Sequence, residues 1–151
     1  MTVEELMTRQ RAEVLEEAFS SLERAHAVHY DRSGEAVTRE RLAELFDVVV
    51  GALRDRELGT VSRYCESLAE ARFRAGFGVA EVQTAFNVLE EAMWRRVVDG
   101  VAPAELSEAI GLLSTILGFG KDTVARTYVS LASERHVPSL DLSGLFAGTD
   151  G

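Results

Sequence analysis

The sequence predicts an all-α protein built as a five-helix antiparallel bundle. Apolar residues recur three and four positions apart along most of the chain, which is the spacing of one face of an α-helix. Only two prolines, Pro103 and Pro138, occur in 151 residues, so strong helix breakers are rare. The expected connections between helices are short, and short connections place neighbouring helices antiparallel.

Size and composition indicate one ordinary globular domain. Domains commonly hold about 100–200 residues, and a chain of this length needs no disulfide or metal to fold. Apolar residues make up 46% of the sequence and charged residues 27%, which is typical of a globular protein. The formal net charge of −9 argues against nucleic-acid binding, because that binding depends on Lys and Arg neutralising phosphates.

Cysteine usage and hydropathy predict a cytoplasmic protein without a membrane segment. Cys65 is the only cysteine, so no intrachain disulfide can form, as is typical of a reducing compartment. Residues 1–10 carry charges and lack the apolar core of a signal peptide. The longest uncharged stretch, Ala109–Gly120, is too short for a bilayer, which needs about 20 apolar residues.

The first expected helix begins after Thr2, with Glu5 completing a capping box. Its apolar stripe continues to Val28 and is interrupted by the polar residues Gln10 and Arg11. This interruption predicts that the first turns leave the main bundle or meet a second subunit. A turn is expected at residues 30–34, where Asp, Ser and Gly occur together.

The second expected helix runs from Thr38 to Arg54. A strand at Val48–Val50 was the alternative, since β-branched residues favour strands, but the flanking apolar residues keep the helical period. Thr60 is expected to cap the third helix, and Gly76 to end it in a left-handed conformation. Phe77 would then fold back onto apolar surface.

The fourth expected helix spans Val79–Asp99 and is ended by Gly100. The fifth starts at Pro103, a residue suited to a first turn, and continues to about Glu134. Three glycines lie inside it, and each costs about 1 kcal/mol relative to Ala, so they predict close helix approach or a kink near residues 118–120. They are Gly111, Gly118 and Gly120. Residues 1–134 are therefore expected to form the helical sensory or interaction domain, and residues 135–151 a flexible tail.

Residues with catalytic or metal-binding chemistry are sparse. His26 and His29 could share a helix face as a metal or haem ligand pair, but zinc sites need three or four ligands, and the helix dipole alone favours histidines at a C-terminus. Glu23 and His26 form a single Glu-x-x-His pair, whereas di-iron bundles use two. Cys65 lies on an apolar stripe, where cysteine is usually a small core residue. We expect no metal, no cofactor and no enzymatic activity.

Two sets of residues are candidates for binding. The bundle interior could hold an apolar ligand or, in a globin-like version of the fold, a haem. The tentative ligand-binding residues are His26, His29, Tyr30, Phe73, Phe86, Met93 and Tyr128. Trp94 and Arg95 form a tentative interface anchor, since Trp and Arg are enriched at the energetic centres of interfaces.

One stretch of sequence resembles a known family. His29–Tyr30 closes the first helix, Ala69–Phe77 reads AEARFRAGF, and Glu81, Val82 and Phe86 follow, then Leu89 and Trp94. This pattern is similar to the N-terminal domain of the RsbR and RsbRD regulators, the RsbT co-antagonists of the bacterial general stress response. The resemblance covers residues 16–131. It implies a helical, often dimeric, sensory or interaction domain without enzymatic activity, usually joined to a STAS domain or a histidine kinase.

The expected function is therefore that of a regulatory module acting through protein–protein contacts, as a homodimer and with a regulatory protein partner. Apolar residues on the first helix or near the glycines of the fifth would provide the contact surface. The alternative is a small-molecule sensor that binds an apolar ligand or haem in the bundle interior. The sequence ends at Gly151 without an output domain, which predicts either a free-standing paralogue or a sensor separated from its output.

Overall fold

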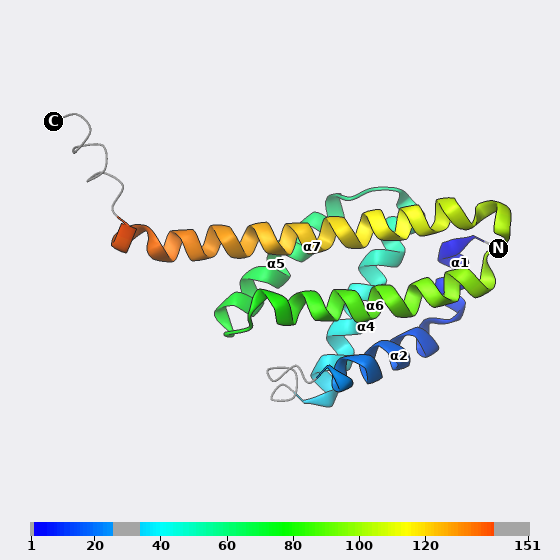
Figure 1. Ribbon diagram of the computed structural model, residues 1–151, viewed down its shortest axis with the longest axis horizontal. Helices are drawn as coiled ribbons and strands as arrows, with labels where there is room; N and C mark the ends of the chain where they lie inside the picture. Colours follow the sequence, from blue (N-terminus) through cyan, green and yellow to red (C-terminus); the bar gives the residue numbers. More distant parts are fainter. Residues whose placement is uncertain (1, 26–33, 141–151) are drawn as a thin grey trace.

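The computed structural model describes residues 2–25 and 34–140, with side chains up to Glu134. Within these residues the protein is all-helical, as predicted, and the long helices α6 and α7 run antiparallel (Figure 1). There are six helices in the described ranges rather than five, mainly because the first expected helix is divided. They are α1 (Val3–Arg9), α2 (Arg11–Arg24), α4 (Glu35–Asp55), α5 (Gly59–Arg74), α6 (Val79–Gly100) and α7 (Pro103–Leu140).

Helix α1 begins with the predicted capping box. The Glu5 backbone N–H donates to Thr2 Oγ1 at 3.2 Å, and the Thr2 N–H donates to Glu5 Oε2 at 3.1 Å. The helix ends at Gln10, whose non-helical ψ of 19° separates α1 from α2. Leu6 and Met7 are buried, and α1 contacts α4 and α6 of its own chain. The expectation that these turns leave the bundle is therefore wrong, because α1 completes the chain's own core, whereas their contact with a second subunit stays a prediction.

Helix α4 confirms the helical reading of Val48–Val50. It starts at Glu35, earlier than predicted, and the buried Thr38 hydroxyl donates to the Gly34 carbonyl at 2.9 Å. Val49 lies in the core at 1% exposure. Arg56 ends the helix in the left-handed region, with φ 55°, and its N–H donates to Ala52 O.

The turn between α5 and α6 is a Schellman motif. Gly76 has φ 89°, its N–H donates to Phe73 O at 3.1 Å, and the Phe77 N–H donates to Arg72 O at 3.0 Å. Phe77 is buried, so the predicted C-terminal signals at Gly76 and Phe77 are confirmed. The predicted cap at Thr60 is wrong. Helix α5 already begins at Gly59, and no side chain caps it.

Helix α7 is the longest helix of the chain. It begins at Pro103, as predicted, and continues past Glu134 to Leu140, so its C-terminal part extends beyond the other helices (Figure 1). Residues 141–151 lie outside the described part of the chain, and the flexible tail stays a prediction.

The core is continuous across all six described helices, and the closest packing joins α5 to α7, α2 to α6, and α6 to α7. Gly120 explains part of this closeness. A Cβ there would lie 3.0 Å from the Phe86 ring and 3.2 Å from Cys65 Sγ. At the other end of the bundle, Gly100 allows the end of α6 to lie close to α1, because a Cβ at Gly100 would lie 2.9 Å from the Leu6 side chain. The predicted close helix approach is thus confirmed at Gly120.

Candidate interaction surfaces

Exposed ion pairs join α2 to α4 on the outside of the bundle. Arg11 binds Asp47 of α4 with two hydrogen bonds of 3.1 and 3.0 Å. Arg39 of α4 donates to Glu16 of α2 at 2.6 Å, and the pairing lowers the pKa of the Glu16 carboxyl. These charged contacts are exposed and contribute little to stability. They cover this side of the bundle with a hydrated, charged surface.

The surface shared by α6 and α7 has a different character. Among the described residues, four large apolar side chains are exposed, and three of them lie here: Trp94 at 45%, Val98 at 39% and Val129 at 66%. Gly111 and Gly118 of α7 point to the same side, and no atom lies within 4 Å of where their Cβ atoms would be. We call these five residues the α6–α7 outer face.

The register of α6 and α7 places Trp94 and Val98 of α6 beside the stretch of α7 that contains Gly111 and Gly118. Lys121 of α7 donates to Glu90 Oε1 at 3.1 Å and to Asn87 Oδ1 at 3.0 Å. Because α6 and α7 run antiparallel, Trp94 and Gly118 each lie about one helical turn from this pair, in the same direction. Val98 and Gly111 follow another turn or two along. An exposed tryptophan therefore lies level with a helix surface that has no side chain.

The charge distribution distinguishes this stretch of α7. Ala109–Gly120 contains no charged residue, in a chain whose formal net charge is −9. Two copies of an acidic protein repel each other wherever like charges meet. The surface of Ala109–Gly120 therefore adds no charge of its own to that repulsion.

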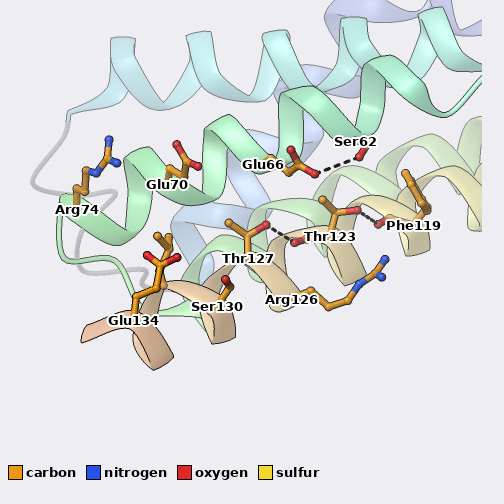
Figure 2. A pocket seen from close by; sticks show the side chains of 11 residues that line it. Ser62, Glu66, Glu70, Arg74, Phe119, Thr123, Arg126, Thr127, Ser130 and Glu134 are labelled. Atoms are coloured by element: carbon orange, nitrogen blue, oxygen red, sulfur yellow. Dashed lines mark hydrogen bonds between the residues drawn. The ribbon is translucent and has the colours of Figure 1, made fainter. Parts of the chain in front are cut away.

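A polar groove runs between α5 and α7 (Figure 2). We call it the α5–α7 groove; its volume is about 510 Å³. Glu66, Glu70 and Arg74 succeed one another along α5 (Figure 2). Three of the seven α7 residues in the wall carry hydroxyls, and the Thr127 hydroxyl donates to the Thr123 carbonyl at 2.8 Å. The complete lining is Ser62, Glu66, Glu70, Arg74, Phe119, Thr123, Arg126, Thr127, Ser130, Leu131 and Glu134.

Sequence reasoning did not identify this groove. The signal was present as carboxylates spaced i,i+4 at Glu66 and Glu70, and as threonines spaced i,i+4 at Thr123 and Thr127. Nothing in the sequence, however, indicated that α5 and α7 would be neighbours.

The tentative ligand-binding residues of the interior are packed against other side chains. Phe86 is 1% and Met93 0% exposed. Phe73 and Tyr128 do come together, with ring centroids 5.4 Å apart in an edge-to-face arrangement. A cavity beside Phe86, lined also by Leu45 and Leu68, has a volume of only about 20 Å³. That is space for one water molecule.

Three other tentative ligand-binding residues, His26, His29 and Tyr30, lie outside the described residues. In the part of the chain that is described, no group of three or more His, Cys, Asp or Glu residues could hold a metal ion. Cys65 is fully buried, and burial raises the pKa of its thiol to about 12. It therefore stays protonated at neutral pH, which makes it a poor nucleophile.

The two residues of the tentative interface anchor behave differently. Trp94 is exposed on the α6–α7 outer face. Arg95 lies on the neighbouring side of α6, donating to Glu17 of α2 at 2.8 Å and to Glu91 at 2.6 Å. The hydrogen bond with Glu17 is the main reason why the pKa of the Arg95 guanidinium is raised. Arg95 thus joins α2 to α6 within the chain.

The fold and these surfaces define an all-helical domain with its hydrophobic core on the inside and an uncovered apolar strip on α6 and α7. No helix within residues 2–25 and 34–140 combines the length and apolar character needed to cross a membrane. A family model described as the RsbT co-antagonist protein rsbRD N-terminal domain matches residues 2–136. The chain belongs to this family and is a regulatory domain of the stress-response type. Neither the curated proteins nor the solved structures contain a match to the sequence.

Proposed function

We propose that this chain is a non-enzymatic regulatory module that works through protein–protein contacts, and that two copies pair through the α6–α7 outer face. The observation that carries the proposal is the exposure of Trp94 and Val98, one helical turn apart on α6, level with the part of α7 where Gly118 presents no side chain. Single exposed apolar residues are ordinary, but a group rimmed by polar residues is typical of an interaction site. Family membership supports the protein partners in general, and the pairing of copies is our inference.

The exposed glycines of α7 support the pairing. Each glycine in a helix interior costs about 1 kcal/mol relative to alanine. Gly120 has a reason inside the chain, since a side chain there would meet Phe86 and Cys65. Gly111 and Gly118 have open space around them and so have no such reason. Close packing of a helix from a second molecule against α7 would explain why these two positions are glycine.

A second copy of the chain fits this face better than a strongly charged partner does. Closed dimers use the same patch on both subunits, so the patch must complement itself. The strip along Ala109–Gly120 is uncharged, and its exposed residues are small. Two copies of this strip can therefore meet without repulsion between like charges. Trp94 can then lie against the glycine-bearing surface of the partner helix, as large aromatic anchors do in interfaces.

Light scattering on the full chain tests the pairing. The wild type should have the mass of a dimer, and a charge placed on the face, by Gly118→Glu or Val129→Glu, should shift the mass to that of a monomer. Val37→Glu is the matched control, because Val37 is 37% exposed on α4, away from the face, and should remain dimeric. Circular dichroism checks that each variant is folded. A monomeric wild type, or an equal loss of mass in Val37→Glu, contradicts the proposal.

A small-molecule sensor remains the second candidate from the sequence. Bound ligands of drug size occupy cavities of roughly 300–1,000 Å³. Among the described cavities, only the α5–α7 groove, at about 510 Å³, falls in that range, and it is polar and open rather than apolar. For this reason we favour protein contact over an apolar ligand.

A further inference from the structure

We propose that Tyr128 links the projecting C-terminal end of α7 to the α5–α6 turn, so that these two regions open and close together. Tyr128 is 8% exposed, and its hydroxyl donates a 2.8 Å hydrogen bond to the Phe77 carbonyl in that turn. The bond joins residues 51 positions apart in the sequence. This hydrogen bond lies within one chain, so the proposed link does not depend on the proposed pairing of copies.

The acceptor side of the link is held in one conformation. The Gly76 φ of 89° and the hydrogen bonds to Phe73 O and Arg72 O fix the course of the backbone just before Phe77. The buried Phe77 ring is covered by two guanidinium groups, those of Arg41 at 5.8 Å and Arg72 at 5.5 Å from the ring centroid. The Phe77 carbonyl is thus a fixed point against which α7 can be held.

On the donor side, Tyr128 is the last buried residue of α7 among those whose side chains are described, and Leu131 and Ala132 after it are half-buried. The Tyr128 ring packs edge to face on Phe73, at an interplanar angle of 78°. Beyond it, Ser133 and Glu134 are exposed, and the helix projects past the bundle (Figure 1). A helix end with few buried contacts opens at low free-energy cost, so its stability depends on the last anchor.

The same anchor is next in sequence to Thr127, which lines the α5–α7 groove. Glu70 and Arg74 on α5 precede the turn, and Thr127 and Ser130 on α7 flank Tyr128 (Figure 2). A molecule that enters the groove or moves the projecting end would therefore act on the hydrogen bond between Tyr128 and Phe77. Loss of this hydrogen bond would make the α5–α6 turn open more often.

Hydrogen–deuterium exchange on the full-length Tyr128→Phe variant tests the link. Phenylalanine keeps the ring and its contact with Phe73 and removes only the hydroxyl, leaving the Phe77 carbonyl without this donor. We expect amide exchange to become about tenfold faster in two places at once, the C-terminal half of α7 and the α5–α6 turn, as for the loss of one buried hydrogen bond. Exchange in α1 and α2 should not change.

The control is Thr127→Val, which removes a neighbouring hydroxyl whose bond to the Thr123 carbonyl stays within α7. Exchange in the turn should be unaffected by this variant. Faster exchange in Tyr128→Phe that is confined to α7, confined to the turn, spread over the whole bundle, or reproduced by Thr127→Val overturns the proposal.

A variant on the turn side provides the reciprocal test. Gly76→Ala puts a side chain at φ 89°, where only glycine is comfortable, and strains the turn. If the two regions are linked, exchange around Tyr128 should increase although α7 itself is unaltered. Unchanged exchange in α7, in a variant whose turn exchanges faster, also overturns the link.

Discussion

The inner and outer faces of α7 can be compared at two glycines only two residues apart. Gly120 faces inward, and its missing side chain lets α7 approach the Phe86 ring and Cys65. Gly118 faces outward into open space, on a stretch without charges. Identical residues in one helix therefore have a structural explanation on one face and none within the chain on the other.

This difference shows how to separate folding from interaction in a helical domain. Inward glycines and apolar residues are accounted for by packing within the chain. The outward glycines lower the stability of the helix, and no contact within the chain compensates for this loss. Gly118, one of them, lies level with the exposed Trp94. The unexplained cost is the reason why we propose that a second copy packs there.

The largest expected effect comes from truncating the inner face. Leu117 is 1% exposed, so Leu117→Ala should lower the free energy of unfolding by about 2–5 kcal/mol through lost burial and a residual cavity. Val129→Ala, on the outer face, should change it by no more than about 0.5 kcal/mol. Urea denaturation at low protein concentration measures both. Similar losses in the two variants would contradict the assignment of the faces.

The next effect comes from adding volume at the inner glycine. Gly120→Val should destabilise the fold by about 1–3 kcal/mol, because its side chain would be forced against Phe86 and Cys65. The change in the urea midpoint measures this loss. A neutral outcome would mean that α6 and α7 are further apart than described.

Alkaline pH should weaken the inner face through Cys65. Burial raises the pKa of this thiol to about 12, whereas the ordinary value is 9.0, so above pH 9 the unfolded chain loses a proton that the folded chain keeps. Stability should then fall with rising pH between about 9 and 12, by up to about 1.4 kcal/mol per pH unit. Compared with Cys65→Ala, the wild type should show the steeper decline in thermal melts. Parallel declines would refute a buried thiol.

The smallest effect is a gain. Gly118→Ala should stabilise the dilute monomer by up to about 1 kcal/mol, since alanine is the better helix former and its Cβ meets nothing. At high concentration the gain should shrink, because the added methyl group would hold a second copy further away. Urea denaturation at two protein concentrations measures both values. A gain that is equal at both concentrations would speak against contact at Gly118.

Much of the fold could be predicted from local signals in the sequence. The capping box at Thr2, the C-terminal signal at Gly76 and Pro103 at the start of α7 depend only on nearby residues, and the structure confirms them. The predicted fate of α1 was wrong because a polar break at Gln10 indicates where a helix ends and not where its neighbour packs. The cap at Thr60 failed because the N-cap position is Leu58, two residues earlier, and no side chain caps the helix.

The interaction surfaces were less predictable, since they depend on which helices become neighbours. The sequence pointed to Trp94 and to the three glycines of α7, of which Gly111 and Gly118 lie with Trp94 on the α6–α7 outer face. It could not separate Gly118 from Gly120, because that distinction requires knowing where Phe86 lies. The α5–α7 groove was missed for the same reason, as it joins residues of α5 and α7 that are at least 45 positions apart.

Trp94 provides the most direct test of pairing through the α6–α7 outer face, because it is the only tryptophan of the chain. Its fluorescence can be followed over a dilution series while sedimentation reports the mass at each concentration. The emission maximum should move to shorter wavelength as the mass rises from monomer to dimer, since pairing removes the indole from water. A rise in mass with no change in emission would show that copies meet elsewhere, and a mass that never rises would show that they do not pair at all.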